Sequence, residues 1–240
     1  INKYLQFILN SDIIKQQFIN SSSGSTQKFI SLGYIRNLKI PLPPLKIQQE
    51  IVEELDSYQK IIDGAKMVVE NWKPKIKVKD DWEMVKLGDI CKKITDGSHN
   101  PPPEGNGEYL MLSSKNIYND SINFENPRKI SKKGFDQENK RTEIKPGDVL
   151  LTIVGTIGRS LVVPESIQPI TVQRSVAVLK PSSKIDSYYL STILRTDPVF
   201  SEIQNKAKGV AQKGIYLNDL KTLSIPLPDI DTQKNIVRLI

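Results

Sequence analysis

The pattern of apolar and polar positions most clearly predicts one long helix. After Pro43 and Pro44, apolar residues recur at alternating spacings of four and three residues as far as Trp72, and Pro74 follows. This is the a/d spacing of a coiled coil, and the prolines are typical of helix boundaries. The pattern therefore predicts a helix over 44–73 that packs on a partner helix through Ile51, Leu55, Tyr58, Ile62, Ala65, Val69 and Trp72.

Residues 80–228 have the pattern of a β-rich domain. Short β-branched runs at 149–154, 161–163 and 175–179 are bounded by Gly or Pro, and they predict core strands. Between 187 and 204, the apolar spacing predicts two short helices that meet at a bend at Asp197-Pro198. We therefore expect an α+β fold, in which a β-rich mixed α/β domain is joined to long helices of the coiled-coil type.

The chain also repeats itself at an offset of 185 residues. Residues 1–55 match residues 186–240 without a gap, with 19 identities over 55 positions. A period this long indicates two copies of a whole domain and not a solenoid. We accordingly expect the C-terminal part of a first domain, its helix, a complete second domain and the truncated start of a second helix at 1–43, 44–73, 80–228 and 229–240.

Composition excludes several classes of protein. One cysteine, Cys91, and one histidine, His99, leave neither an internal disulfide nor a zinc site built from several Cys and His ligands. No apolar run approaches the roughly 18 residues that span a bilayer, so we expect no membrane association and a cytoplasmic location. The net charge of +7 and the pI near 9.3 favour a polyanionic partner. Because Ile1 stands in place of an initiator Met, we expect a piece of a longer protein.

Motifs that would carry catalysis are incomplete. The Asn100-Pro101-Pro102-Pro103 run lacks the aromatic residue of an adenine methyltransferase motif, and Ile215 stands where a phosphate-binding loop needs its lysine. His99 has no arrangement typical of a nucleophilic triad around it. We therefore predict a binding protein without catalytic or metal-ligating residues.

Four short motifs in a fixed order resemble one known family. They are IPLPPLKIQQEI at 40–51 with its echo at 225–236, Gly-x-x-Gln-Lys at 24–28 and 209–213, WEMVKLGDI at 82–90, and GDVL at 147–150. Together with the repeat and the long helix, they resemble the specificity subunit of type I restriction-modification enzymes. The resemblance covers essentially the whole chain.

The resemblance implies a function and a set of partners. It implies two target recognition domains, each reading half of a split site in double-stranded DNA, held apart by two antiparallel conserved helices. It also implies methyltransferase subunits, which hold S-adenosylmethionine, and a restriction or motor subunit, which uses ATP and Mg. No cofactor is expected in this chain. Since the chain is shorter than a full subunit, a homodimer through the helix stripe would restore the two-fold arrangement.

The candidate DNA-binding residues lie in polar loops of 80–228. Arg pairs with guanine, Asn or Gln with adenine, and Ser or Thr with either. Gln212-Lys213 recurs in the first copy as Gln27-Lys28, which favours a shared role in gripping phosphate or in internal support over base choice. Lys115, with Arg128, Lys132, Lys133 and Arg141, is predicted to contact phosphate. The DNA-binding set is Ser98, His99, Asn100, Lys115, Thr156, Arg159, Gln173, Arg174, Lys206, Lys208, Gln212 and Lys213.

Two alternative functions stay open at this point. The chain could be the recognition region of a fused restriction-methylation enzyme, in which case a longer polypeptide would contain methyltransferase motifs. It could instead be a coiled-coil assembly scaffold without a role on DNA, an alternative suggested by the heptad stripe and the modest net charge.

Overall fold

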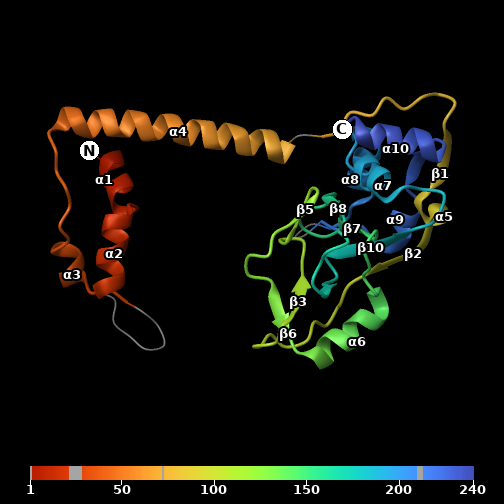
Figure 1. The fold of residues 1–240 in the computed structure, drawn as a ribbon, viewed down its shortest axis with the longest axis horizontal. Coiled ribbons are helices and arrows are strands. Elements are labelled where there is room, and N and C mark those ends of the chain that lie inside the picture. The colour runs from red at the N-terminus through yellow and green to blue at the C-terminus, as the bar shows by residue number, and fades with distance from the viewer. Residues whose placement is uncertain (1, 22–28, 72, 210–212) are drawn as a thin grey trace. The chain divides into compact units, whose positions relative to one another are not determined.

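The computed structural model describes residues 2–21, 29–71, 73–209 and 213–240, without the side chains of 70 and 71. The chain divides into two compact units, residues 1–72 and residues 73–240. Figure 1 labels most of the helices and strands of the two units. Each unit has its own packing.

The described residues of the first unit form four helices. They are α1 (Asn2–Leu9), α2 (Asp12–Ser21), α3 (Leu32–Arg36) and α4 (Leu45–Asn71). The start of the chain packs on the first turns of α4, where Tyr4 is buried and its hydroxyl donates a 2.8 Å hydrogen bond to the Pro41 carbonyl. Ile14 of α2 is also fully buried.

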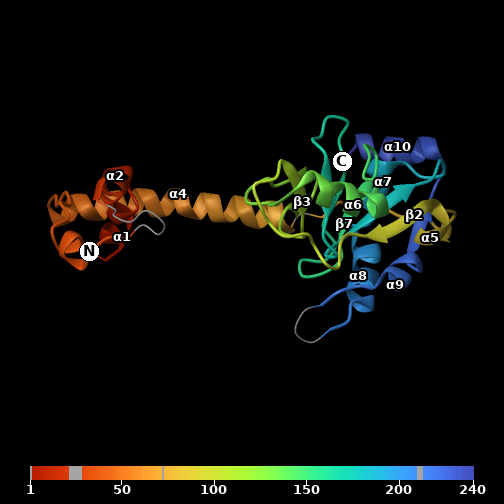
Figure 2. The ribbon, with the colours of Figure 1, turned by 90° about the horizontal axis from the view of Figure 1, so that it is seen from below.

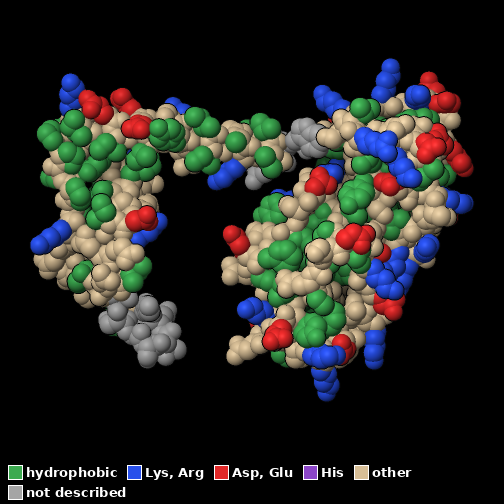
Figure 3. All heavy atoms as spheres, in the orientation of Figure 1, with side chains coloured by type: hydrophobic (Ala, Val, Ile, Leu, Met, Phe, Trp, Pro, Cys, Tyr) green, Lys and Arg blue, Asp and Glu red, His purple; other side chains and the backbone are tan. Residues whose placement is uncertain are grey.

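Helix α4 confirms the long helix that the heptad spacing predicts. It begins directly after Pro44 and is 27 residues long. Most of its predicted stripe is exposed, including Leu55 at 37%, Tyr58 at 52% and Val69 at 73%, while Ile51 is half-buried. Figure 3 shows apolar side chains uncovered along this helix. Trp72, the last predicted position of the stripe, lies outside the described residues.

The second unit is built around an antiparallel four-stranded sheet. Its order is β2 (Cys91–Asp96), β10 (Val176–Pro181), β7 (Val149–Thr152) and β8 (Ser160–Val162). A second sheet has the order β6 (Arg128–Ile130), β3 (Tyr109–Leu112) and β9 (Ile170–Val172), with β3 and β9 parallel. Two smaller pairs complete the strands: β1 (Glu83–Lys86) with β11 (Ser224–Leu227), and β4 (Ile117–Tyr118) with β5 (Ser121–Ile122).

Both faces of the four-stranded sheet are buried. Successive side chains of a strand point to opposite faces, so Val149 and Leu151 join one apolar cluster while Leu150 joins the other. The first cluster includes residues of α5 (Leu87–Ile90), α7 (Ser187–Ile193), α8 (Asp197–Lys206) and α9 (Leu217–Lys221). The second includes residues of β3 and β9. Helix α6 (Lys132–Thr142) contacts β9, and α10 (Ile230–Arg238) contacts α7. This is the predicted α+β class.

The predicted strands and helices of this unit differ from the structure only at their ends. The run 149–154 forms a strand that stops at Thr152, and 175–179 corresponds to β10. Helices α7 and α8 are separated at 194–196, next to the predicted bend. Helices α8 and α9 lie side by side, as Figure 2 shows.

The repeat in the sequence is also a repeat in structure. At the offset of 185, helices α1 to α4 correspond to α7 to α10. The same hydrogen bonds recur: the Tyr189 hydroxyl donates to the Pro226 carbonyl at 2.8 Å, as Tyr4 donates to Pro41. Gln48 Nε2 donates to the Pro43 carbonyl at 2.8 Å, and Gln233 Nε2 donates to the Pro228 carbonyl at 2.8 Å. The two segments are therefore copies of one module.

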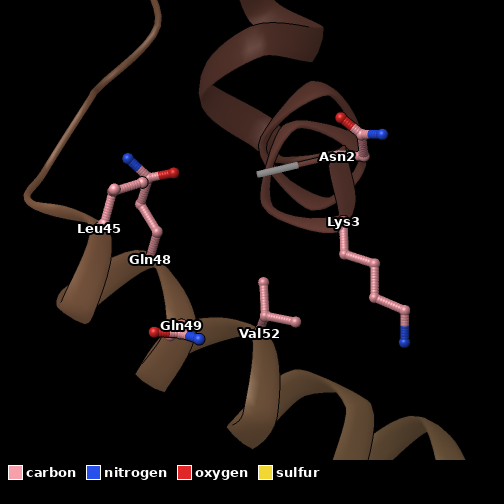
Figure 4. A pocket seen from close by; sticks show the side chains of 6 residues that line it. All are labelled: Asn2, Lys3, Leu45, Gln48, Gln49 and Val52. Atoms are coloured by element: carbon pink, nitrogen blue, oxygen red, sulfur yellow. The ribbon is translucent and has the colours of Figure 1, made fainter.

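The two copies differ beside this glutamine. Gln233 Oε1 accepts a hydrogen bond from the Asp186 amide at 2.8 Å, and its Nε2 also donates to the Lys184 carbonyl at 3.1 Å. Gln48 Oε1 is buried and has no partner in the part of the chain that the structure describes. A cavity of about 670 Å³ lies beside it between α1 and α4, lined by the side chains shown in Figure 4: Asn2, Lys3, Leu45, Gln48, Gln49 and Val52.

Candidate nucleic-acid interface

Most of the predicted loops meet at one end of the four-stranded sheet. Strands β2 and β7 end there, with Asp96 paired to Ala177 and Thr152 paired to Val176, so their antiparallel neighbours β10 and β8 begin there. The loops that follow β2, precede β10 and join β7 to β8 are therefore neighbours. These loops contain residues 97–100, 173–175 and 153–159.

Main-chain hydrogen bonds connect these loops to one another. The Arg174 amide donates to the Ser98 carbonyl at 2.9 Å, and the Ser114 amide donates to Ser175 Oγ at 3.0 Å, which brings the segment of Lys115 to the same place. The Gly155 amide donates to the Lys213 carbonyl at 3.1 Å. Loops that are far apart in sequence thus form one continuous surface.

Gly97 permits the closest of these approaches. A Cβ built on Gly97 would lie 1.9 Å from the Val172 carbonyl oxygen, which is backbone and cannot move aside easily. The next amide, of Ser98, donates to that same carbonyl at 3.0 Å. The absence of a side chain at Gly97 therefore lets the end of β2 run directly beside the end of β9.

A groove of about 470 Å³ opens on this surface. Three basic side chains line it, Arg141, Arg174 and Lys208, together with His99, Asp96 and exposed Tyr216. Arg174 is exposed and has no side-chain hydrogen bond or ion pair within the described ranges. Lys208 Nζ lies 3.4 Å from Asp219 Oδ2.

Asp96 is the buried acceptor of the groove. Its Oδ2 lies 2.8 Å from His99 Nε2, and its Oδ1 accepts a hydrogen bond from Arg141 Nη2. Arg141 Nε also donates to Thr95 Oγ1 at 3.3 Å. The Asp96 side chain is only 9% exposed, whereas that of Arg141 is 50% exposed. The carboxylate therefore fixes a guanidinium that still faces solvent.

The structure moves several predicted residues away from the groove. Lys206 lies in helix α8 and not in a loop as predicted, and its Nζ contacts Glu202 at 3.5 Å and Thr222 Oγ1 at 3.2 Å. Arg159 stacks on Tyr118, with 4.4 Å from its guanidinium carbon to the ring centre. Neither residue lines the groove.

The other predicted residues differ in exposure. Ser98 is buried, so its contribution is structural, and Gln173 is half-buried. Asn100, Lys115, Thr156 and Lys213 are exposed, as are His99, Arg174 and Lys208 in the groove. Gln212 lies outside the described residues, as do its counterparts in the first copy, Gln27 and Lys28.

A second basic patch lies on α6. Lys132, Lys133 and Lys140 surround a shallow hollow with Asp136 and Gln137. Lys132 Nζ lies 2.7 Å from Asp136 Oδ2, and this partner raises the pKa of Lys132. The three lysines are exposed, and exposed lysines suit phosphate contacts better than base reading.

No three His, Cys, Asp or Glu side chains of the described residues are grouped so that they could hold a metal ion. Within these residues, no helix combines the length and the apolar character that crossing a bilayer requires. Burial raises the pKa of the Cys91 thiol to about 12.

Comparison with known proteins decides the family. A family model described as "Type I restriction modification DNA specificity domain" matches residues 1–71 and 79–240. The chain belongs to this family. The resemblance stated from the sequence motifs is therefore confirmed.

The relatives of this specificity domain are longer proteins. The type I restriction enzyme EcoBI specificity subunit of Escherichia coli is 28% identical over 260 residues, covering 92% of this chain and 54% of the relative. The putative type I restriction enzyme MjaX specificity subunit of Methanocaldococcus jannaschii is 26% identical, covering 94% and 55%. The chain thus spans about half the length of these curated relatives.

One solved structure supports the fold of the specificity domain. It comes from work on complex assembly and conformational transition of the type I R-M system, and the match has a TM-score of 0.50 at 22% identity. The match covers 99% of this chain and 62% of that chain. At this identity the likeness concerns the fold alone.

Sequence reasoning missed the central pair of the groove. The sequence analysis predicts no role for Asp96 and only a phosphate contact for Arg141. The two residues are 45 positions apart, and only the packing of α6 near the end of β2 brings them together. Tyr216 was missed because it follows the basic loop, where the pattern shows only an isolated aromatic residue.

Proposed function

We propose that this chain recognises DNA as part of the specificity subunit of a type I restriction-modification complex. In this proposal residues 80–228 read one half of a split site. The observation that carries the proposal is the meeting of several polar loops around a groove with three basic side chains, in a member of a DNA specificity family. The chain itself contributes recognition and no catalysis.

The residues around the groove have different tasks in this proposal. Sequence is read by hydrogen bonds to base edges, for which exposed Arg174, Asn100 and Thr156 have suitable donors and acceptors. Exposed Lys115 and Lys213 contact phosphates, which positions the domain without specifying a base. His99, paired with Asp96, forms part of the groove wall.

The exposed stripe of α4 has a packing role in the complex. Apolar residues at heptad spacing bury against a second helix, and α10 is the start of the second copy of that helix. We assign the stripe to packing on the equivalent helix, from the second copy or from a second chain. Leu55 and Ile62 represent it, with exposures of 37% and 47%.

Other subunits supply the chemistry. Methyltransferase subunits with S-adenosylmethionine modify the site, and a restriction or motor subunit with ATP and Mg cleaves the DNA. No cofactor belongs to this chain in the proposal, and the complex works in the cytoplasm, where it meets DNA.

Selection from a randomised duplex pool tests the proposal. We expect the chain, with its methyltransferase subunit present, to enrich a short motif at two salt concentrations, with weaker enrichment when the subunit is omitted. Binding that falls with salt but enriches no motif in either condition would contradict the proposal, because phosphate contacts alone carry no sequence information.

The exposed stripe also favours a scaffold as the second candidate function. A scaffold would associate through α4 but would not protect a specific DNA sequence. A fused restriction-methylation enzyme, the other alternative, would enrich a motif as the specificity subunit does and would differ by methyltransferase motifs in one longer polypeptide. The selection therefore separates the scaffold from both DNA-reading alternatives.

A further inference from the structure

We propose that Arg141 reads a guanine of the half-site and that Asp96 is the positioning residue that aims it. This inference rests on the proposed DNA-recognition function and goes beyond it, because it names one specificity-determining residue and the base it prefers. It starts from an asymmetry within the groove: a buried carboxylate holds Arg141, whereas the side chain of Arg174 has no hydrogen-bond or ion-pair partner among the described residues.

The contacts of Arg141 leave one edge of its guanidinium available. Nη2 donates to Asp96 and Nε donates to Thr95 Oγ1, while Nη1 has no hydrogen-bond partner within the described residues. A guanidinium has five N–H donors in a fixed plane. Fixing two of its nitrogens fixes the direction of the remaining donors, so less rotamer freedom is lost when a base binds.

The position of Arg141 fits a base reader. It lies in the last turn of α6, and its half-exposed side chain lines the groove together with residues of the loops 97–100 and 173–175 and of the segments 208–209 and 214–216. Guanine presents two acceptors, O6 and N7, on its major-groove edge, and Arg is the side chain that matches them in a bidentate arrangement.

The charge of the pair argues against a phosphate as the ligand. Asp96 is buried beside Arg141, so the negative charge cancels much of the attraction that the guanidinium would exert on a phosphate. The geometry of the free N–H donors is unaffected by this cancellation. The pair therefore favours a neutral ligand with two acceptors, whereas unpaired Arg174 keeps its full charge.

The test uses the chain in complex with its methyltransferase subunit and the randomised duplex selection. We expect the unaltered chain to enrich a motif that contains a guanine. In Arg141→Gln the preference for guanine at that position of the motif should fall about tenfold or more. Arg141→Lys keeps the positive charge but lacks the planar pair of N–H donors, so it should lose the same preference for guanine. Asp96→Asn should weaken the preference for guanine at that position of the motif and leave the base preferences at the other positions unchanged.

A matched variant separates base reading from general affinity. Lys132→Ala on α6 removes an exposed cation that is paired with Asp136, and it should lower affinity equally for all sequences with no change in the motif. Urea unfolding of each variant shows that it is folded before selection.

Two results would overturn the inference, and they have different consequences for the proposed function. If both Arg141 variants enrich the unaltered motif, Arg141 is not a base reader, and the proposed function still holds. If the unaltered chain enriches no motif at all, the proposed function fails, and this inference fails with it.

Discussion

At the residue scale, a tyrosine and a glutamine carry the same task in both copies of the repeat. The hydroxyls of Tyr4 and Tyr189 each donate to the carbonyl of a proline that lies 37 residues further along. Tyr189 is fully buried, and burial raises the pKa of its phenol. The glutamines Gln48 and Gln233 bind the start of the following helix to the proline turn before it. These shared hydrogen bonds give a structural reason for the recurrence of the tyrosine and the glutamine in both copies.

Replacing Tyr189 by Phe should destabilise the second unit. The change leaves the Pro226 carbonyl without this buried donor, which costs about 1–3 kcal/mol in the free energy of unfolding. Urea unfolding measures the change. Tyr188→Phe is the matched control, because Tyr188 is 57% exposed and its hydroxyl has no hydrogen-bond partner within the described residues. Equal effects of both substitutions would refute the role given to Tyr189.

Cys91 should react slowly with alkylating reagents in the folded protein. The thiolate is the reactive form, and burial raises the pKa of this thiol to about 12. At pH 8 the thiolate fraction should be on the order of a thousandfold lower than in unfolded protein. Because the folded state binds this proton more tightly, the contribution of Cys91 to the free energy of unfolding should be constant below pH 8 and should fall above about pH 9. Iodoacetamide labelling with and without urea measures the rates, and equally fast labelling in both would contradict the expectation.

At the scale of elements, the end of one sheet determines the candidate site. Four strands alternate in direction, so three loops distant in sequence emerge side by side where β2 and β7 end. Gly97 lets β2 approach β9 at that end, and the bridges of Gly214 with Val154 and with Lys208 bring Lys208 to the same place. The groove is thus a consequence of strand order together with one glycine.

Replacing Gly97 by Ala should be severely destabilising. The added Cβ would lie 1.9 Å from a backbone oxygen, so β2 and β9 must separate, at a cost of about 3 kcal/mol or more in the free energy of unfolding. The matched control is Gly105→Ala, since a Cβ there meets no atom within 4 Å. Urea unfolding compares the two variants. A Gly97→Ala chain as stable as the control would show that the close approach is not required.

The elements differ in how far the sequence predicts them. Helix α4 and the paired copies follow from local spacing and from the repeat, which need no knowledge of packing. Which loops meet also depends on strand order, and the sequence does not supply that order. For this reason the loop residues His99, Arg174 and Lys208 were found, while the Asp96–Arg141 contact, the stacking of Arg159 on Tyr118 and the pairing of Lys206 with Glu202 were not.

At the scale of the whole molecule, the proposed function uses two different surfaces. One is the groove of the second unit, and the other is the apolar stripe of α4 in the first unit. In the proposed function, the groove contacts DNA and the stripe contacts a helix. The chain spans about half the length of its curated relatives, and the proposed function uses both surfaces within a larger complex.

A charge placed in the stripe should weaken association. Leu55→Asp puts a carboxylate where an apolar residue packs in the proposed helix pair, so self-association or binding to the second helix should weaken at least tenfold. Ser57→Asp adds the same charge to α4 outside the stripe and should have little effect. Sedimentation of the chain, alone and with its methyltransferase subunit, measures both. If the two variants associate equally strongly, the stripe does not have the proposed packing role.

Recognition of a DNA half-site by residues 80–228 is tested most directly by transferring these residues to another specificity subunit. These residues would replace the corresponding second domain of a type I specificity subunit whose methylated site is known, and the methylated motif of the reconstituted complex would be mapped on genomic DNA. If residues 80–228 read one half-site, we expect one half of the split site to change to a new sequence while the other half stays the same. An assembled, active complex that methylates the original site on both halves would contradict it.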